Sequence, residues 1–434
     1  QAWHQGTSLR VVLRRFMTSV APFLPPEVPT QWAGVDERLG FWGATTSLAV
    51  SMLGTGIVAF PYAFALCGYV VGPLALLLVG ILAYLSYASL IRCTEKVHAA
   101  SYGGLLQAVP RVWSQYTNVA LWLLLILATT AYVIISADII KSVCLPGSGD
   151  VPSVGSRDVP LAFRNHILFA IILIVIFPLC LLKSLHGLSI ISTYCSCAIV
   201  TVVGLIVGKA FCIHRDTPPF EDASAAAVTQ PRFVVLAVPI LGCAMFGHMN
   251  MSQIYAELKP QIKHRAHLVA LTACAAVVTL YMVVGGVGYA AFGRVAKPDV
   301  VVQIADSSGE HGAVVVIQAL LASFIVLKTP LIILPLRSLT ISIVAPEMTP
   351  ADLPTWSHVL LTLGLLACVY VAAIALPDLS KLLEILGAVC VVPLCFVVPA
   401  RLSWAVEVPR PVVRCLVLTV VGVSASAFSL IAIM

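Results

Sequence analysis

Apolar segments long enough to cross a lipid bilayer recur along nearly the whole chain and leave no room for a separate soluble domain. A spanning helix needs roughly 18 or more predominantly apolar residues. Of the 434 residues, 60% are hydrophobic and 10% are charged, and the mean hydropathy is +1.02. A soluble domain is only about 45–50% apolar. The sequence therefore predicts an all-α, polytopic protein that is integral to the lipid bilayer.

Eleven of these segments are predicted to be transmembrane helices. They cover about 42–66, 69–91, 113–138, 162–182, 185–208, 233–255, 265–291, 313–336, 357–376, 379–400 and 411–433. The predicted organisation is a cytoplasmic N-terminal tail (1–40), helices 1–5 (41–210), helices 6–10 (232–402) and helix 11 (410–434). None of the connecting segments resembles a folded catalytic domain.

The positions of the basic residues predict the orientation of the chain. Lys and Arg are enriched in the cytoplasmic loops of membrane proteins. With the N-terminus in the cytoplasm, fifteen of the 25 Lys and Arg residues lie on the cytoplasmic side and nine on the opposite side, while Lys328 falls inside a span. A cytoplasmic N-terminus is therefore expected.

The first predicted span contains residues that interrupt a helix. Gly54, Thr55, Gly56 and Pro61 lie within its apolar stretch, about twelve residues after Trp42. At about 1.5 Å per residue, this distance puts the interruption near the middle of the membrane. Backbone groups freed there need protein or a water-filled cavity as partner. The interruption indicates a binding site, although the glycines would also allow neighbouring helices to pack closely.

A second irregular segment lies five spans later, with Pro239, Gly242, Gly247, His248 and Asn250 in the sixth span. Broken helices at corresponding positions of two five-helix halves are typical of secondary transporters built from inverted repeats. Free N–H groups at the start of a half-helix can hold an anionic group, and carbonyl groups at the other end can hold a cation. A zwitterionic amino acid matches both demands.

Eight pieces of sequence, in order along the chain, resemble the amino acid/auxin permease family and most nearly its neutral amino acid transporter branch. They are LGTGIVAFPYAFALCG, SYGGL, AYVIISADII, FPLCLLKSLHGLSIIS, FGHMNMSQIYAEL, YMVVGGVGYAAFG, TPLIILPLRSL and LPDLSKLLEILGAV. The resemblance implies a LeuT-like fold of eleven transmembrane helices, in which spans 1–5 and 6–10 are inverted repeats and one helix is appended. It also implies amino acid transport by alternating access.

The resemblance further implies a substrate site built from spans 1, 3, 6 and 8. Its residues are Gly54, Thr55, Gly56, Tyr132, Phe246, Gly247, His248 and Thr329. Two of them have alternative roles. Tyr132 would also suit core packing, and His248 could contact substrate, gate the path, sense pH or serve the architecture alone.

Two positions depart from the family pattern. Sodium-coupled members of the neutral amino acid branch have an asparagine and a hydroxyl residue where this chain has Val50 and Lys328. Valine has no side-chain oxygen and an ammonium group repels sodium, so we do not expect sodium to bind at this ion-coupling position. Protons rather than sodium are expected to drive transport.

Lys328 lies nine residues before Arg337, which is the predicted cytoplasmic end of span 8, and hence ~13 Å inside the membrane. A charge buried there costs roughly 2.5–3.5 kcal/mol. Lys328 could be a proton-coupling site, a permanent ammonium in place of sodium, or a structural lysine bonded to unwound carbonyl groups.

The sequence thus predicts a secondary active transporter of amino acids that is proton-coupled or otherwise sodium-independent. The alternatives are a membrane sensor that binds an amino acid and signals without transport, and an enzyme, for which no G-x-S-x-G, H-E-x-x-H or Walker A motif is present. No Cys/His set has zinc spacing, so neither a metal nor a cofactor is expected, and no nucleic acid partner. The plasma membrane and an endolysosomal or vacuolar membrane both suit a proton-driven carrier.

Overall fold

The computed structural model describes residues 39–99, 102–144, 161–181, 185–216, 231–297, 299–301, 303–304, 311–344, 354–376, 382, 385–406 and 411–433. Most of the predicted N-terminal tail lies outside the described residues, so the description concerns the unit from Leu39 to Met434. In its described part the regular structure is helical, apart from an isolated bridge between Leu39 and Leu258. The predicted all-α membrane class is confirmed.

The first predicted span is a bent pair of helices. It consists of α2 (Phe41–Met52), a 3-10 helix η3 (Thr55–Ala59) and α3 (Phe60–Cys67). The two halves meet at 60°, because Leu53 and Gly54 between them have extended backbones. Pro61 lies in the first turn of α3. N–H groups in the first turn have no intrahelical partner, so a proline there costs the helix no hydrogen bond. The predicted break at Gly54 is therefore confirmed.

The sixth span is also broken. It consists of α11 (Pro231–Ala244) and α12 (His248–Glu257), and residues 245–247 between them are not helical. Pro239 and Gly242, which the sequence places in the irregular segment, lie inside α11.

The remaining helices follow in chain order. They are α4 (Val71–Val97), α5 (Tyr102–Leu106), α6 (Arg111–Cys144), α7 (Leu161–Ala170), η4 (Ile171–Ile176), α8 (Phe177–Cys180), α9 (Leu185–Asp216), η5 (Pro260–Arg265), α13 (Ala266–Phe292), η6 (Gly293–Val295), α15 (His311–Val344), α16 (Thr355–Ala375), η8 (Leu386–Val391), η9 (Pro393–Val397), α18 (Val398–Ala405) and α19 (Pro411–Ile433). Helices thus occur in every predicted span. Among the described residues, six helices are long and apolar enough to cross a membrane, and the bent pair makes a seventh. The count of eleven crossings and the division into two repeats stay predictions.

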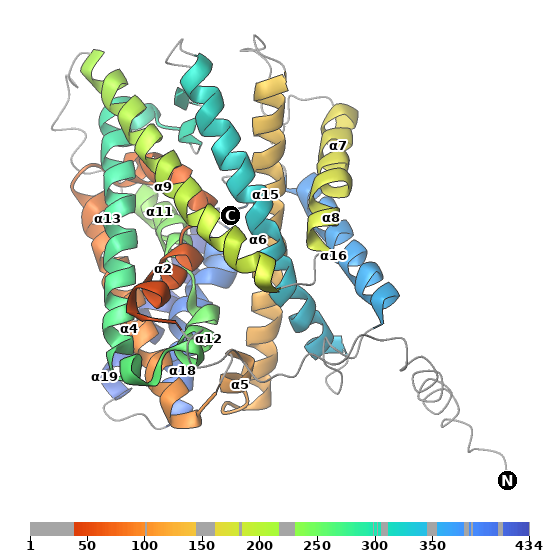
Figure 1. Ribbon diagram of the computed structural model, residues 1–434. Helices are drawn as coiled ribbons and strands as arrows, with labels where there is room; N and C mark the ends of the chain where they lie inside the picture. The colour runs from red at the N-terminus through yellow and green to blue at the C-terminus, as the bar shows by residue number, and fades with distance from the viewer. Residues whose placement is uncertain are drawn as a thin grey trace. The chain divides into compact units, whose positions relative to one another are not determined.

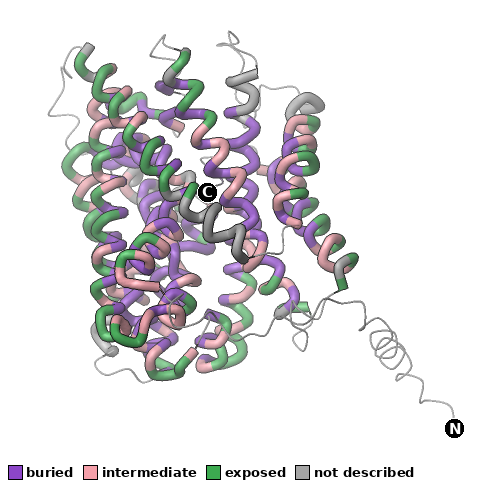
Figure 2. Tube along the Cα trace, viewed as in Figure 1, coloured by how far each residue is buried: buried purple, intermediate pink, exposed green. Residues whose placement is uncertain are grey.

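The two broken spans lie among the other helices of the unit (Figure 1). α13 packs against α2, α3, α4 and α9, while α11 packs against α3 and α4, and α12 packs against α2 and α4. α6 and α15 pack against each other and cross at an angle in Figure 1. Buried residues face the interior of this packing and exposed residues face outward (Figure 2).

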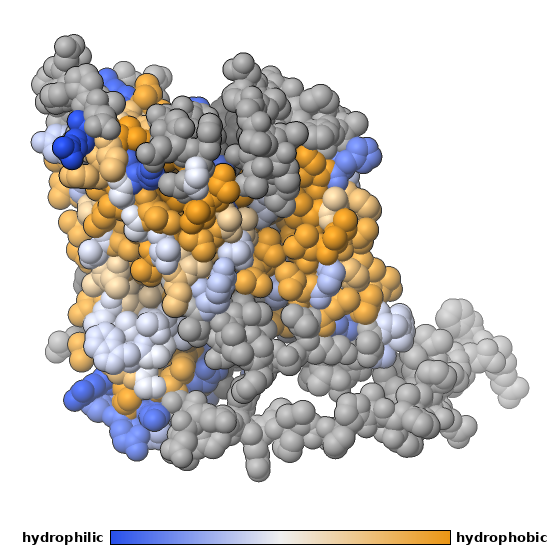
Figure 3. Space-filling model, turned by 45° about the horizontal axis from the view of Figure 1, so that its top comes forward, coloured by the Kyte–Doolittle hydropathy of each residue, from blue (hydrophilic) through white to orange (hydrophobic). Residues whose placement is uncertain are grey.

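The outward faces of the helices are apolar. On α4 the exposed residues Leu74, Leu77, Leu78 and Ile81 are spaced by three and four, so they form one stripe. Figure 3 shows an apolar band between more hydrophilic ends of the coloured surface. This pattern is the one expected of a protein surrounded by lipid.

Arg337 does not mark the end of span 8, as the sequence suggested. α15 continues to Val344, and the Arg337 side chain is buried. Its Nη1 donates hydrogen bonds to the Cys180 carbonyl at 3.0 Å and to the Thr362 hydroxyl at 3.1 Å. The guanidinium finds its partners inside the protein and needs no membrane surface, so the depth of Lys328 cannot be counted from Arg337.

Candidate functional site

Both breaks open onto one cavity of about 330 Å³. Of the predicted substrate residues, Gly54, Gly56, Tyr132, Phe246 and Gly247 line it, and so do the two residues that depart from the family pattern, Val50 and Lys328. The structure thus brings together positions that lie up to 278 residues apart in sequence. Their contact with a substrate stays a prediction.

The first break brings the start of η3 to the wall of this cavity. Gly54 precedes η3, and Gly56 lies in its first turn. Helix geometry leaves the first N–H groups of a helix without an intrahelical partner, and these carry partial positive charge. A Cβ added at Gly54 would lie 3.5 Å from the Tyr132 hydroxyl, whereas a Cβ added at Gly56 would meet nothing within 4 Å. The wall at Gly56 therefore borders open space.

The carbonyl groups on the other side of the same break have side-chain donors. Lys328 Nζ donates to the Val50 carbonyl at 3.3 Å and also to the Leu53 carbonyl. The Tyr281 hydroxyl donates to the Met52 carbonyl at 3.3 Å. Carbonyl groups at a helix C-terminus are unpaired within the helix and partially negative, so an ammonium group there is favourable.

Lys328 is 8% exposed and lies with its Nζ 5.3 Å from the centre of the Phe324 ring. Its burial is offset by two carbonyl acceptors and by a cation–π contact. This geometry is what the permanent-ammonium and structural-lysine interpretations require. A proton-coupling role requires in addition that these bonds open during the transport cycle.

The second break approaches the first very closely at Gly247. A Cβ on Gly247 would lie 2.5 Å from Ser51 Oγ, 2.9 Å from the Tyr87 hydroxyl and 3.2 Å from Met52 Cγ. The Tyr87 hydroxyl also donates to the Met245 carbonyl at 3.0 Å. A larger residue at this position would require the Ser51 and Tyr87 side chains to shift, so the packing of α2 and α4 against the unwound part of span 6 favours glycine.

Replacing Gly247 with alanine is expected to destabilise the protein by about 1–3 kcal/mol and to lower its activity, because the added methyl overpacks this contact. Since Ser51 Oγ is the nearest obstacle, adding Ser51→Ala to Gly247→Ala should recover part of the loss. Thermal unfolding of the purified variants measures this. Gly286→Ala is the matched control, because a Cβ there meets nothing within 4 Å. Equal losses in the single and double variants would contradict the packing argument.

Two predicted substrate residues are not among the described residues of the cavity wall. His248 is fully buried and stacks on the Tyr87 ring at 4.1 Å and 13°, and among the described residues neither of its ring nitrogens has a hydrogen-bond partner. The Thr329 hydroxyl donates to the Ile325 carbonyl of its own helix at 2.9 Å. The side chain of Thr55 lies outside the described part of the chain.

Sequence reasoning missed several residues of the wall. Ser47 and Ser51 of α2, Asn250 of α12 and Tyr281 of α13 line the cavity with polar groups. Proximity to the breaks along the chain could have indicated Ser51 and Asn250. Nothing in the sequence around Tyr281 indicates that its hydroxyl reaches the Met52 carbonyl.

Known proteins resemble the whole described unit. The family model described as "Transmembrane amino acid transporter protein" matches residues 37–433. Amino acid transporter AVT6E of Arabidopsis thaliana is 25% identical over 376 residues, which cover 84% of this chain and 76% of the relative. Vacuolar amino acid transporter 5 of Schizosaccharomyces pombe is 22% identical over 378 residues, which cover 85% of this chain and 84% of the relative.

A solved structure has the same fold. The crystal structure of MhsT in complex with L-phenylalanine matches with a TM-score of 0.61 and 13% sequence identity, over 92% of this chain and 100% of that chain. MhsT has the LeuT fold, so the LeuT-like fold predicted for this chain is confirmed.

Proposed function

Because this chain belongs to the family of transmembrane amino acid transporter proteins, we propose that it is a secondary active transporter that moves amino acids across the membrane by alternating access. The observation that carries the proposal is the cavity at the two helix breaks, with Lys328 bonded to backbone carbonyl groups at its wall. The substrate binds in this cavity.

A zwitterionic amino acid binds by its two backbone charges. Its carboxylate takes the N–H groups at the start of η3, from Gly54 to Gly56, where the partial positive charge of the helix end attracts an anion. Its ammonium group takes carbonyl groups freed by the unwound segment at 245–247, whose Phe246 and Gly247 also line the cavity. Nothing in this arrangement depends on the amino acid side chain.

Transport is sodium-independent and driven by protons or by exchange. The Val50 and Leu53 carbonyl oxygens would otherwise be free to bind a cation at the end of α2, and the Lys328 ammonium occupies them. Val50 contributes only this backbone oxygen, because its side chain has no ligand atom. A carrier of this kind suits the plasma membrane or an endolysosomal or vacuolar membrane, with its N-terminus in the cytoplasm.

Uptake into proteoliposomes tests the proposal. The purified protein is reconstituted, and accumulation of a radiolabelled neutral amino acid mixture is measured with sodium or with choline, each with and without an inward proton gradient. We expect uptake of equal rate in sodium and in choline. A proton-coupled carrier also accumulates substrate against its gradient only when protons flow inward, whereas an exchanger needs amino acid inside the vesicles.

Two outcomes would contradict the proposal in different ways. Uptake that requires sodium and ignores the proton gradient overturns the proposed coupling but keeps the transporter. Saturable binding without uptake or counterflow of any amino acid overturns the transporter and supports a membrane sensor.

A further inference from the structure

We infer that Tyr87 of α4 and Tyr281 of α13 are an equivalent pair of positioning residues, each of which holds the break of the opposite five-helix half in the conformation that binds substrate. The inference rests on the proposed function and adds the residues that fix the two unwound segments. It follows from the contacts that each tyrosine makes on the two sides of a break.

Tyr281 holds the first break on both of its sides. Its hydroxyl donates to the carbonyl group of Met52, the last residue of α2, at 3.3 Å. Its ring stacks on the ring of Phe60, the first residue of α3, with ring centres 4.2 Å apart and an angle of 9° between the planes. Tyr281 is fully buried. One side chain therefore fixes the end of α2 relative to the start of α3.

Tyr87 holds the second break in the same way. Its hydroxyl donates at 3.0 Å to the carbonyl group of Met245, which directly follows α11. Its ring stacks on the imidazole of His248, the first residue of α12, with ring centres 4.1 Å apart and an angle of 13°. Tyr87 and His248 are both fully buried. The stack gives the His248 ring a packing role at the break.

The two tyrosines correspond in the predicted division of the chain into two halves. Each hydroxyl donates to the carbonyl group that lies two residues before a break glycine, Gly54 or Gly247. Tyr87 follows Gly54 by 33 residues, and Tyr281 follows Gly247 by 34. Each tyrosine contacts the broken span of the other half. Core packing requires only that a buried hydroxyl has some partner, so it does not predict that both partners have the same position relative to a break.

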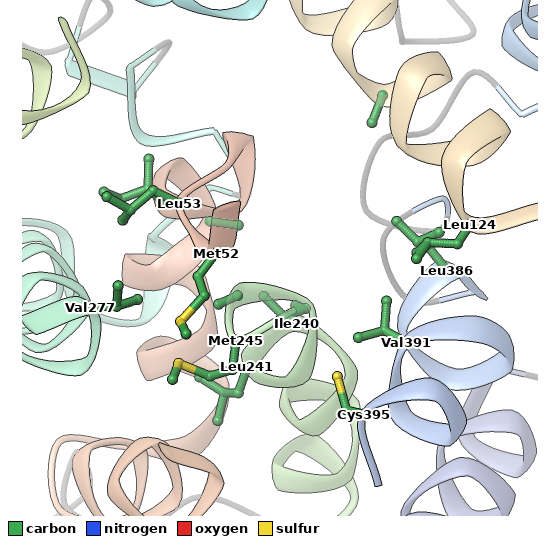
Figure 4. Packing of buried hydrophobic residues seen from close by; sticks show 14 of the residues in the cluster. Met52, Leu53, Leu124, Ile240, Leu241, Met245, Val277, Leu386, Val391 and Cys395 are labelled. Carbon is green, nitrogen blue, oxygen red and sulfur yellow. The ribbon is translucent and has the colours of Figure 1, made fainter. Parts of the chain in front are cut away.

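The breaks need such partners because a non-helical segment lacks the regular hydrogen bonds that fix a helix. A segment that is already ordered loses less conformational freedom when a ligand binds. The Met52 and Met245 side chains lie beside each other in Figure 4, and a Cβ on Gly247 would lie 3.2 Å from Met52 Cγ. The two fixed segments therefore meet at the cavity.

The two tyrosines have different effects on the substrate. We assign the substrate carboxylate to the first break and its ammonium group to the second. Tyr281 therefore positions the backbone groups that bind the carboxylate, and Tyr87 positions those that bind the ammonium group.

Tyrosine-to-phenylalanine variants test the inference, because phenylalanine keeps the ring stack and removes only the hydroxyl. The purified variants are reconstituted in proteoliposomes. KM and the maximal rate are measured with the single radiolabelled neutral amino acid that the wild type takes up fastest. We expect Tyr281→Phe and Tyr87→Phe each to raise KM about three- to tenfold, because each loses one hydrogen bond that orders its break.

Tyr194→Phe is the matched control. The Tyr194 hydroxyl also has a hydrogen-bond partner, the Ser323 hydroxyl at 2.8 Å, and neither residue is among the described residues of the cavity wall. This variant should keep the wild-type KM. Phe60→Leu and His248→Leu remove the stacking partners of Tyr281 and Tyr87 and keep the hydroxyls, so they test the same contacts if a phenylalanine variant does not fold.

Substrate analogues separate positioning from a purely structural role. The amide of the same amino acid lacks the carboxylate charge, and the corresponding α-hydroxy acid lacks the ammonium group. Their inhibition of uptake is compared with that by the unlabelled amino acid. The preference for the amino acid over its amide should fall in Tyr281→Phe and Phe60→Leu, and its preference over the hydroxy acid in Tyr87→Phe and His248→Leu. A structural loss lowers the unfolding temperature and the maximal rate without changing these preferences.

Three outcomes overturn different parts of the argument. If the variants fold and both KM and the preferences stay at wild-type values, the positioning role is wrong and the transporter stands. If every variant lowers both preferences equally, the assignment of one tyrosine to each end of the substrate is wrong. Absence of uptake and counterflow by the wild type overturns the proposed function itself.

Discussion

Replacing Gly56 with leucine is expected to reduce amino acid uptake to background while the protein stays folded in the membrane. Gly56 lines the cavity in the first turn of η3, and a Cβ added there meets no atom within 4 Å. The new side chain therefore has open space at its Cβ and extends into the cavity. It occupies the place that we assign to the substrate carboxylate, beside the N–H groups at the start of η3. The leucine side chain therefore reduces the volume left for the substrate and blocks its access to these N–H groups.

The measurement compares uptake with the amount and thermal stability of the purified protein. Gly286→Leu is the matched control, because a Cβ at Gly286 also has open space around it and this residue is on the exposed face of α13. The control should transport at the wild-type rate. Normal uptake by a folded Gly56→Leu variant would show that the substrate does not bind at this break.

Replacing Lys328 with methionine is expected to abolish net transport. Methionine keeps the length of the side chain but cannot donate to the Val50 and Leu53 carbonyl groups. A buried acceptor left without its donor costs about 1–3 kcal/mol, so the end of α2 also becomes less stable. Uptake and thermal unfolding are measured for this variant and for Lys328→Arg, which keeps a positive charge.

This variant separates the three interpretations of Lys328. If the lysine carries the coupling proton, Lys328→Met loses uptake driven by a proton gradient but keeps exchange of internal for external amino acid. If the lysine is a permanent ammonium in place of sodium, both activities are lost in Lys328→Met and partly kept in Lys328→Arg. If the lysine is purely structural, both variants have a lower unfolding temperature than the wild type, and the loss of uptake is in proportion to this decrease. Wild-type uptake by Lys328→Met would contradict all three.

The breaks could be predicted from the sequence because they are local features. Gly54, Thr55, Gly56 and Pro61 lie close together in one apolar stretch and indicate the first break, whereas glycines alone are no sufficient signal, because Gly285, Gly286 and Gly288 lie inside the continuous helix α13. The unusual role of Lys328 could also be predicted from the sequence, because an ammonium group inside an apolar segment needs hydrogen-bond acceptors. The structure supplies them at the end of α2.

Directions of side chains could not be predicted in the same way. His248 and Thr329 lie next to Gly247 and Lys328, which line the cavity, yet the described cavity wall does not include them. On a helix, neighbouring residues point about 100° apart, so the rotation of α15 decides that Lys328 rather than Thr329 meets the cavity. Arg337 was predicted to mark the cytoplasmic end of span 8, whereas its partners on α8 and α16 are brought to it only by the packed fold.

The sequence by itself determined that this chain is a polytopic membrane protein with two broken spans and a lysine inside an apolar segment, because hydropathy, glycine and charge act through the residue and its immediate neighbours. The tertiary structure alone decided that both breaks share one cavity, that Lys328 meets the carbonyl groups of Val50 and Leu53, and that a tyrosine donates to a carbonyl group at each break. Those contacts join segments far apart in the chain, and they depend on helix rotation and packing that no local pattern encodes.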